Sequence, residues 1–241
     1  MSIQVRRISL APLLKRERKK ARKSAARSQN PAAQESAAPL KTSTAPTDIG
    51  HAAESSDSTS HPLTIFTIGH STHPIDEFIA LLKTYGIEQL VDVRTVPKSR
   101  HVPQFNSEAL AEALGKQGIA YVHLKALGGL RHAKKDSINT GWRNASFRGY
   151  ADYMASNEFE QGIDRLIGLA KAKRTVIMCA EAVPWRCHRS LIGDALLARG
   201  ITVEDIMSAT SVRPHKLTEF AKVDGQQITY PTDKNLELFS S

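Results

Sequence analysis

The folded part of the chain is predicted to begin with residues 63–69, Leu63-Thr64-Ile65-Phe66-Thr67-Ile68-Gly69, where β-branched and aromatic side chains dominate. A run of this length and composition, closed by a glycine, is typical of a buried β-strand. Pro74 follows, and from Ile75 onward apolar residues recur at helical spacing until Gly86 ends the pattern. The sequence therefore predicts a strand followed directly by a helix.

The same order of strand and helix repeats along the rest of the chain. Further strands are predicted by apolar runs at residues 89–93, 119–124, 175–178 and 201–203, of which the last is expected to be the final strand. Helical patterns separate these runs and end at glycines such as Gly118 and Gly200. Strands that alternate with helices favour a mainly parallel sheet with helices on both faces. The predicted fold class is therefore α/β.

The N-terminal quarter of the chain differs in composition from the rest. Its first 27 residues hold ten Lys and Arg against one acidic residue, whereas residues 63–241 hold 22 basic and 19 acidic residues. Residues 24–62 are rich in Ala, Ser, Thr and Pro and bury too little apolar surface to offset the entropy of ordering. We expect a disordered basic tail and linker at residues 1–62 and a single α/β domain at residues 63–241. The tail suits a targeting leader, a nucleic-acid contact or a solvated extension.

Composition and short motifs exclude several classes of protein. The chain has two cysteines, which rules out a secreted scaffold held by many disulfides and suits a reducing compartment, so a cytoplasmic location is expected. No apolar run reaches the roughly 18 to 20 residues that span a bilayer. No Gly-x-Gly-x-x-Gly or Walker-type loop is present, and the cysteine spacing is unlike that of zinc sites. Neither a cofactor nor a metal is therefore expected.

Unusual polar residues follow the predicted strands. In an open parallel sheet, ligands bind beyond the carboxyl ends of the strands, where loops and helix N-termini converge. The segments that reach this edge are Gly69-His70-Ser71, Asp92-Val93-Arg94, the loop with Gly128-Gly129, and residues 179–190. A purely structural edge does not need this mixture of His, Arg, Glu, Cys and Trp. We therefore expect a binding or catalytic site there.

Cys187 is the preferred nucleophile of this site. A helix is predicted to begin near it, so free backbone N–H groups and the helix dipole favour a negative charge on its sulfur. Arg186, His188 and Arg189 add positive potential, which further favours thiolate, the nucleophilic form of cysteine. For Cys179, at the end of an apolar strand, a buried and unreactive side chain is the favoured interpretation.

Other residues at these strand ends are assigned roles around the cysteine. Those expected to bind an anion or substrate are Arg94, Arg189, His188, Asp92, Ser71, Gly128, Gly129, Arg131, Trp142 and Asn144. Glu181 and His70 are expected to act as general acid or base, although an exposed loop glutamate without such a role is equally compatible. Because a charge beside an apolar strand is expected to be paired, an ion pair of Asp92 with Arg94 or Arg189 is favoured over catalysis by Asp92.

The segment from residue 128 to 148 is too long to be an idle connection. It carries five basic residues against one acidic residue, with Trp142 and Phe147 interleaved. Basic and aromatic side chains together suit a phosphate and a stacked base, so nucleotide or nucleic-acid binding is one interpretation. A lid over a small anion, or a loop anchored by its own aromatic residues, fits the composition as well.

Several of these motifs together resemble a known family. Residues 63–231 are similar to the domain of unknown function 488 family in Thr67-Ile68-Gly69-His70-Ser71, Val91-Asp92-Val93-Arg94, Leu127-Gly128-Gly129, Gly141-Trp142-Arg143-Asn144 and Cys179-x-Glu181-x-x-Pro184-x-x-Cys187-His188-Arg189. A more distant likeness is to rhodanese-like domains, through Asp92-Val93-Arg94 after an early strand and Arg189-Ser190 at a helix start. That likeness implies a rhodanese-like fold and a sulfur-carrying cysteine, either Cys179 followed by an insertion or Cys187 in its place.

Three hypotheses for the function follow. The leading one is a cysteine-dependent, sulfurtransferase-like enzyme with a rhodanese-like fold, in which Cys187 is the nucleophile or sulfur carrier for a small anionic substrate. The second is an enzyme that repairs or modifies DNA, RNA or a nucleobase with Glu181 or Asp92, and that contacts nucleic acid through residues 128–148 and 1–27. The third is a non-catalytic module that senses a nucleotide or a small anion.

Overall fold

A computed structural model describes residues 62–232, so the tail and linker predicted for residues 1–62 lie outside the described residues apart from Pro62. The strands are β1 (Thr64–Gly69), β2 (Gln89–Asp92), β3 (Ala120–His123), β4 (Thr175–Cys179), β5 (Thr202–Ser208), β6 (Ser211–Pro214), β7 (Lys222–Asp224) and β8 (Gln227–Thr229). The α-helices are α1 (Ile75–Thr84), α2 (Ser107–Gly115), α3 (Ala145–Tyr153), α4 (Asn157–Ala172) and α5 (Arg189–Leu197). Short 3-10 helices occupy η1 (Pro103–Phe105), η2 (Lys125–Leu127) and η3 (Pro184–Arg186).

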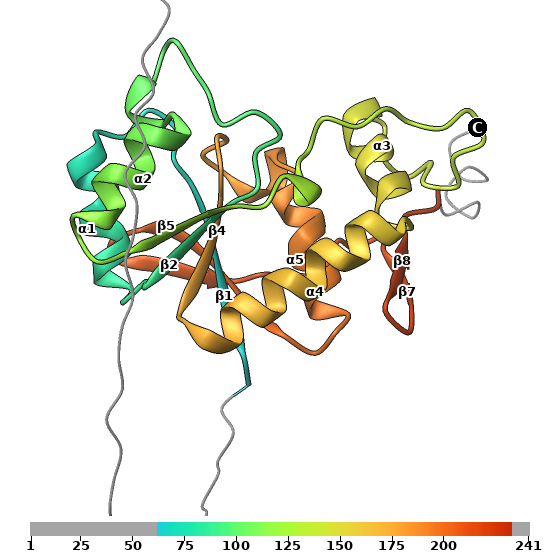
Figure 1. The fold of residues 1–241 in the computed structure, drawn as a ribbon. Helices are drawn as coiled ribbons and strands as arrows, with labels where there is room; N and C mark the ends of the chain where they lie inside the picture. The colour runs from blue at the N-terminus through green and yellow to red at the C-terminus, as the bar shows by residue number, and fades with distance from the viewer. Residues whose placement is uncertain (1–61, 233–241) are drawn as a thin grey trace, which may run out of the picture. The chain divides into compact units, whose positions relative to one another are not determined.

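The larger sheet is mainly parallel. Its strand order is β3-β2-β4-β1-β5-β6, and β7 and β8 form a separate two-stranded sheet. The pairs β3–β2, β2–β4, β4–β1 and β1–β5 are parallel, whereas β6 runs antiparallel to β5. Figure 1 shows α1 and α2 on one side of this sheet and α4 and α5 on the other. The predicted α/β class, with helices on both faces, is confirmed.

Apolar side chains of the central strands contribute to the cores on both faces of the sheet. Phe66 and Met178 belong to the core cluster that includes residues of α1 and α2. Their chain neighbours Ile65 and Ile177 belong to the cluster that includes residues of α4 and α5. Successive side chains of a strand point to opposite faces, so a strand covered on both sides needs an unbroken apolar run. This explains why β1 and β4 are recognisable in the sequence.

The expectation that residues 201–203 form the final strand is wrong. β5 continues to Ser208, and three further strands follow it. Most residues of β6 are exposed, and this edge strand ends at Pro214, so it lacks the apolar alternation by which strands are recognised. The C-terminal segment still belongs to the fold, because Tyr230 is fully buried and donates a hydrogen bond to Asp194 in α5.

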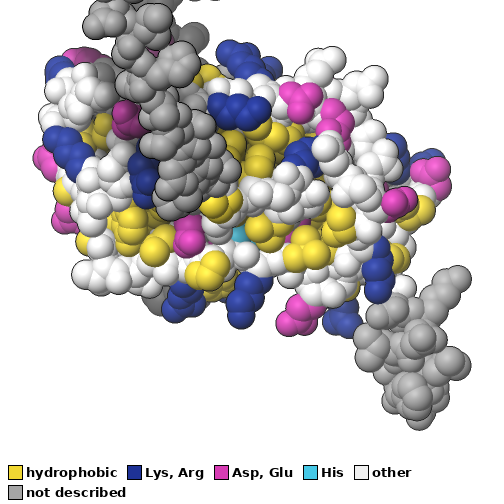
Figure 2. Space-filling view, turned by 90° about the horizontal axis from the view of Figure 1, so that it is seen from below, with side chains coloured by type: hydrophobic (Ala, Val, Ile, Leu, Met, Phe, Trp, Pro, Cys, Tyr) yellow, Lys and Arg dark blue, Asp and Glu magenta, His cyan; other side chains and the backbone are white. Residues whose placement is uncertain are grey.

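The surface of the described residues carries both signs of charge. On the face shown in Figure 2, Lys and Arg side chains are dispersed among Asp and Glu and do not merge into one basic patch. This pattern agrees with the near balance of 22 basic and 19 acidic residues within residues 63–241. Within residues 62–232, no helix is both long enough and apolar enough to cross a membrane.

Candidate functional site

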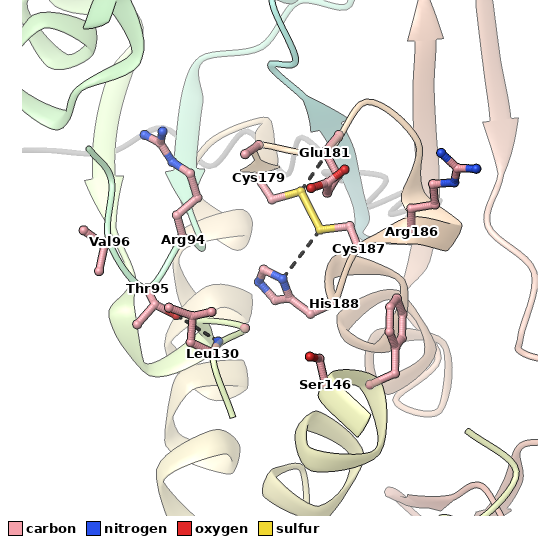
Figure 3. Close-up of a pocket in the computed structure, with 13 residues that line it drawn as sticks. Arg94, Thr95, Val96, Leu130, Ser146, Cys179, Glu181, Arg186, Cys187 and His188 are labelled. Atoms are coloured by element: carbon pink, nitrogen blue, oxygen red, sulfur yellow. Dashed lines mark hydrogen bonds between the residues drawn. A yellow bond between two sulfur atoms is a disulfide. The ribbon is translucent and has the colours of Figure 1, made fainter. Parts of the chain in front are cut away.

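A cavity of about 350 Å³ lies at the carboxyl ends of β2 and β4. Its lining comes from residues 94–96, residues 129–130, the start of α3, and the segment from Cys179 to His188. The segments that follow β2, β3 and β4 therefore meet there, as Figure 3 shows. The segment after β1, Gly69-His70-Ser71, does not line the cavity.

Cys179 and Cys187 are joined by a disulfide at this cavity (Figure 3). Cys179 is the last residue of β4, and Cys187 lies two residues before α5 begins. Both are nearly buried, with 1% and 4% of their surfaces exposed. Sequence reasoning did not predict this pairing, because the intervening loop has no periodic pattern that would fix its return path. The loop is folded back by η3, where the Cys187 N–H donates to the Pro184 carbonyl.

The sulfur of Cys187 lies at the N-terminus of α5. It accepts the backbone N–H of Arg189 at 3.5 Å, and Nδ1 of His188 lies 3.5 Å from it. His188 is the N-cap residue of α5, which confirms the helix start predicted near Cys187. When the disulfide is reduced, this N–H group and the helix dipole favour a thiolate at Cys187.

His188 is oriented as a proton acceptor. Its Nε2 lies 3.0 Å from the Val93 carbonyl, which can only accept, so Nε2 carries the proton and Nδ1 presents its lone pair to Cys187. Burial, reinforced by the charge of Arg189, lowers the pKa of His188 to about 4. The ring is therefore neutral at pH 7. This low pKa makes the ring a weak base while the disulfide is intact. After reduction, a thiolate at Cys187 attracts the protonated ring and raises its pKa, so the ring can then accept the thiol proton. The sequence predicted instead that His188 would bind an anion.

The two glycines predicted to lie in the site provide space for their neighbours. A Cβ on Gly129 would lie 2.4 Å from Nδ1 of His188, so only a glycine lets the ring occupy its position. A Cβ on Gly128 would lie 2.9 Å from the Cα of Thr95. The main chain after β3 can thus approach both the histidine and the end of β2.

Arg189 is a buried cation that supports the cysteine loop. Its Nη1 donates to the sulfur of Cys179 at 2.9 Å and to the carbonyl of Glu181 at 2.7 Å, and its Nη2 donates to the carbonyl of Ala182 at 2.9 Å. Burial lowers the pKa of Arg189 to about 10, so the guanidinium stays charged at neutral pH. Within residues 62–232, no ion pair includes Arg189.

Arg94, predicted to bind the anion, is engaged by a carboxylate. The fully buried Asp92 accepts hydrogen bonds from Nε and Nη2 of Arg94 and from the hydroxyl of Tyr121. The Asp92–Arg94 ion pair expected from the sequence is present, and the alternative pair of Asp92 with Arg189 is not. Arg94 lines the cavity, but Asp92 largely neutralises its charge.

His70 has partners on both ring nitrogens. Its Nδ1 donates to the Ser71 carbonyl at 2.8 Å, and its Nε2 accepts from Nη1 of Arg94 at 3.2 Å. The ring stacks on Phe105, and burial lowers its pKa to about 4. His70 therefore contacts Arg94, which lines the cavity, but does not line the cavity itself.

The segment after β1 holds the cysteine loop in place. The N–H groups of His70 and Ser71 donate to the carbonyls of Cys179 and Ala180, each at 3.0 Å. Gly69 allows this close approach, because a Cβ there would lie 1.7 Å from the Glu181 carbonyl oxygen. The motif that the sequence singled out here is thus a support for the loop.

Glu181 is the one acidic residue among those that line the cavity. Its side chain is exposed, and its main-chain carbonyl oxygen lies 3.9 Å from the sulfur of Cys179 (Figure 3). Arg186 adds an exposed cation to the lining. The rim also includes Val96 and Leu130, which are 61% and 74% exposed.

The segment from residue 128 to 148 is anchored by its own aromatic and polar side chains. Trp142 stacks on Phe147, with ring centroids 4.8 Å apart, and also packs against Phe220 and Tyr230. Arg131 lies 3.5 Å over the ring of Tyr153. This arrangement corresponds to the self-anchored loop, one of the alternatives that the composition allowed.

Two further polar residues of this segment have structural partners. Asn144 caps α3 by accepting from the N–H groups of Ser146 and Phe147. Asp152, which sequence reasoning missed, accepts from the Lys134 N–H and from the Ser137 hydroxyl. The sequence did hold a signal for this role, because Asp152 directly follows the apolar residues Tyr150 and Ala151 in a predicted helix, and a carboxylate beside buried residues is expected to have hydrogen-bond partners.

Other residues that line the cavity were not predicted. Thr95 accepts from the Leu130 N–H through its Oγ1, and Ser146 reaches the cavity from the first turn of α3. Small hydroxyl side chains in loops carry no signal of their own in one sequence. Within residues 62–232, no group of three or more His, Cys, Asp or Glu side chains is arranged to hold a metal ion.

Comparison with known proteins identifies the family. The family model described as "Domain of unknown function DUF488" matches residues 74–196, which cover β2 to β4, all five α-helices except the last residue of α5, and both cysteines. No curated protein and no solved structure matches the chain significantly. The family match spans about half of the chain, and the chain belongs to this family.

Proposed function

We propose that this member of the DUF488 family is a cysteine-dependent enzyme that takes a sulfur atom from a small anion. The position of the Cys187 sulfur carries the proposal. This sulfur lies 3.5 Å from Nδ1 of His188, whose lone pair faces it, and 3.5 Å from the backbone nitrogen of Arg189 at the start of α5. A base and a site for negative charge thus meet at one thiol.

The first step uses Cys187 in its reduced form. His188 takes the proton of the thiol on Nδ1, and the thiolate attacks the outer sulfur of a thiosulfate-like anion. The sulfur–sulfur bond of that anion breaks, and sulfite leaves with the bonding electron pair. The transferred sulfur remains on Cys187 as a persulfide. The start of α5 stabilises the negative charge on the sulfur throughout this step.

The size and lining of the cavity favour a small anion. Its volume of about 350 Å³ lies at the lower end of small-molecule sites, which begin near ~300 Å³. The exposed Arg186 and the buried Arg189 supply positive potential, and Ser146 supplies a hydroxyl that can donate to an oxyanion. Glu181 acts as the general acid or base that exchanges protons with solvent, since it is the acidic side chain that lines the cavity.

The test is mass spectrometry of Cys179→Ser, which leaves Cys187 as the single thiol of the chain. After reduction and exposure to thiosulfate, the variant is expected to gain one sulfur atom on Cys187 and to release one equivalent of sulfite. The matched variant Cys187→Ser is expected to do neither. Stabilisation of the folded chain by thiosulfate without any sulfur transfer would contradict the proposal and favour the non-catalytic anion sensor.

A further inference from the structure

We infer that Cys179 is a second catalytic residue, which resolves the persulfide on Cys187 by forming a disulfide and releasing hydrosulfide. The inference rests on the proposed function of Cys187. It adds a product, hydrosulfide, and a requirement for a dithiol reductant in each turnover.

The first observation is the contact between the two sulfur atoms. They form a disulfide at the cavity, and the chain contains no other cysteine. Cys179 is held by β4 and by the His70 N–H, which donates to its carbonyl at 3.0 Å. Cys187 is held by η3 and by the first turn of α5. A group transferred to Cys187 therefore remains within reach of Cys179.

The second observation is the hydrogen bond from Arg189 to Cys179. The charges of Asp205 and Glu181 favour the charged form of Arg189, but no carboxylate of the described residues is close enough to form an ion pair with it. Its Nη1 instead lies 2.9 Å from the sulfur of Cys179. In the reduced protein, a thiolate at Cys179 supplies a negative charge in direct contact with the guanidinium.

The two thiols are thus activated in different ways. Cys187 has a neutral histidine as its base, and Cys179 has a guanidinium that stabilises the thiolate. A resolving cysteine must be a thiolate when the persulfide forms, and it needs no base of its own if a fixed cation already holds it in that state. This difference assigns attack on substrate to Cys187 and resolution to Cys179.

The resolving step balances as a thiol–disulfide exchange. The Cys179 thiolate attacks Sγ of Cys187, and the bond between the two Sγ atoms forms. The bond from Cys187 to the transferred sulfur breaks, and its electron pair leaves with that sulfur. The sulfur takes back the proton that His188 removed from the Cys187 thiol and departs as hydrosulfide. Over both steps, two protein thiols and one thiosulfate give one disulfide, one sulfite and one hydrogen sulfide. The protein thiols lose two electrons, which reduce the transferred sulfur, and an external dithiol then restores both thiols.

The experiment compares reduced wild type with Cys179→Ser after removal of reductant and addition of thiosulfate. The wild type is expected to release one hydrosulfide per chain, to lose both free thiols and to gain no sulfur in mass. Cys179→Ser is expected to retain the persulfide and to release no hydrosulfide. A wild type that accumulates persulfide, or a variant that releases hydrosulfide as the wild type does, would overturn the inference.

A second arm separates this inference from the proposed function. One equivalent of dithiobis(nitrobenzoate) places a leaving thiol on Cys187 without any sulfur donor. The wild type is expected to release two thionitrobenzoate ions per reagent molecule and to keep none, because Cys179 expels the second ion. Cys179→Ser is expected to release one ion and to keep the other. Retention by the wild type would refute resolution by Cys179. If the wild type releases both ions but thiosulfate yields no sulfite, the sulfur-transfer proposal alone has failed.

Discussion

Nη1 of Arg189 donates a hydrogen bond of 2.9 Å to the sulfur of Cys179, and the same nitrogen donates to the carbonyl of Glu181. One guanidinium therefore supports the loop that carries Glu181 and also supplies positive charge to a thiol. Since Arg189 begins α5, its own N–H reaches the sulfur of Cys187 at the same time. Both cysteines depend on the position of this single residue.

The charge of Arg189 is expected to lower the pKa of Cys179. In Cys187→Ser, where Cys179 is the single thiol, the added substitution Arg189→Gln should raise that pKa by roughly 1 to 3 units, because a cation close to a thiolate is lost. The pKa is measured from the rate of alkylation by iodoacetamide as a function of pH. Arg189→Lys should keep part of the effect. If the pKa of Cys179 is the same in Arg189→Gln and Arg189→Lys, the charge of residue 189 is not the cause.

Loss of the His188 base is expected to slow attack by Cys187. In Cys179→Ser, the substitution His188→Asn should reduce the rate of persulfide formation at neutral pH on the order of 100-fold, a typical contribution of a positioned base. Stopped-flow measurement of sulfite release gives this rate. His73→Asn is the matched control, since His73 is exposed and does not line the cavity. Equal rates for the two variants would remove His188 from the mechanism.

Gly129→Ala tests whether the position of the His188 ring matters. The new Cβ would lie 2.4 Å from Nδ1, so the ring must move and its contact with Cys187 is lost. The rate of sulfite release should fall by about the same factor as in His188→Asn, with little loss of fold. Gly168→Ala in α4 is the control, because nothing lies within 4 Å of the Cβ added there. An unchanged rate in Gly129→Ala would contradict the site geometry.

The pH dependence of stability is expected to have a maximum near pH 6.5. Burial lowers the pKa of His70 and His188 to about 4, so their contribution is complete above pH 6.5 and is lost as the pH falls toward 4. Each shift corresponds to stability on the order of 3 kcal/mol. Chemical denaturation at a series of pH values measures this acidic decline. A flat profile between pH 4 and pH 6.5 would contradict it.

His215 is expected to produce the alkaline decline. Burial opposes its charge, but the hydrogen bonds that its ring donates to Asp194 and Asp205 raise its pKa to about 9. Its contribution is therefore complete below pH 6.5 and is lost as the pH rises through 9. The same denaturation series on His215→Gln should show a lower maximum and no decline between pH 6.5 and pH 9. Persistence of that decline in the variant would place its origin elsewhere.

The parts of the fold that the sequence predicts are those with local signals. β1 and β4 are unbroken apolar runs because both of their faces are buried, and α1, α2 and α5 are each followed by a glycine with positive φ, namely Gly86, Gly118 and Gly200. β6 gave no such signal, since it is an exposed edge strand that ends in Pro214. An edge strand whose residues are mostly exposed needs no apolar pattern, whereas the edge strand β3 is partly buried throughout and was predicted from its apolar run.

The sequence predicted where the candidate site lies better than it predicted what each residue does there. The segments after β1, β2, β3 and β4 were expected to meet, and the cavity is lined by the last three but not by the segment after β1. The role of each residue depends on partners distant in sequence, as with His70 and Arg94, which are 24 residues apart. The disulfide between Cys179 and Cys187 depends on the path of a loop that no local pattern describes. Such long-range contacts are what a single sequence leaves open.

Cys187, once reduced, is expected to be a thiolate near neutral pH. The most direct measurement is the pH dependence of alkylation of Cys179→Ser by iodoacetamide, because Cys187 is then the single thiol of the chain. The start of α5 and the His188 ring beside the sulfur predict an apparent pKa clearly below the ordinary value of about 8.5, near 7 or lower. An apparent pKa at or above about 8.5 would contradict the account.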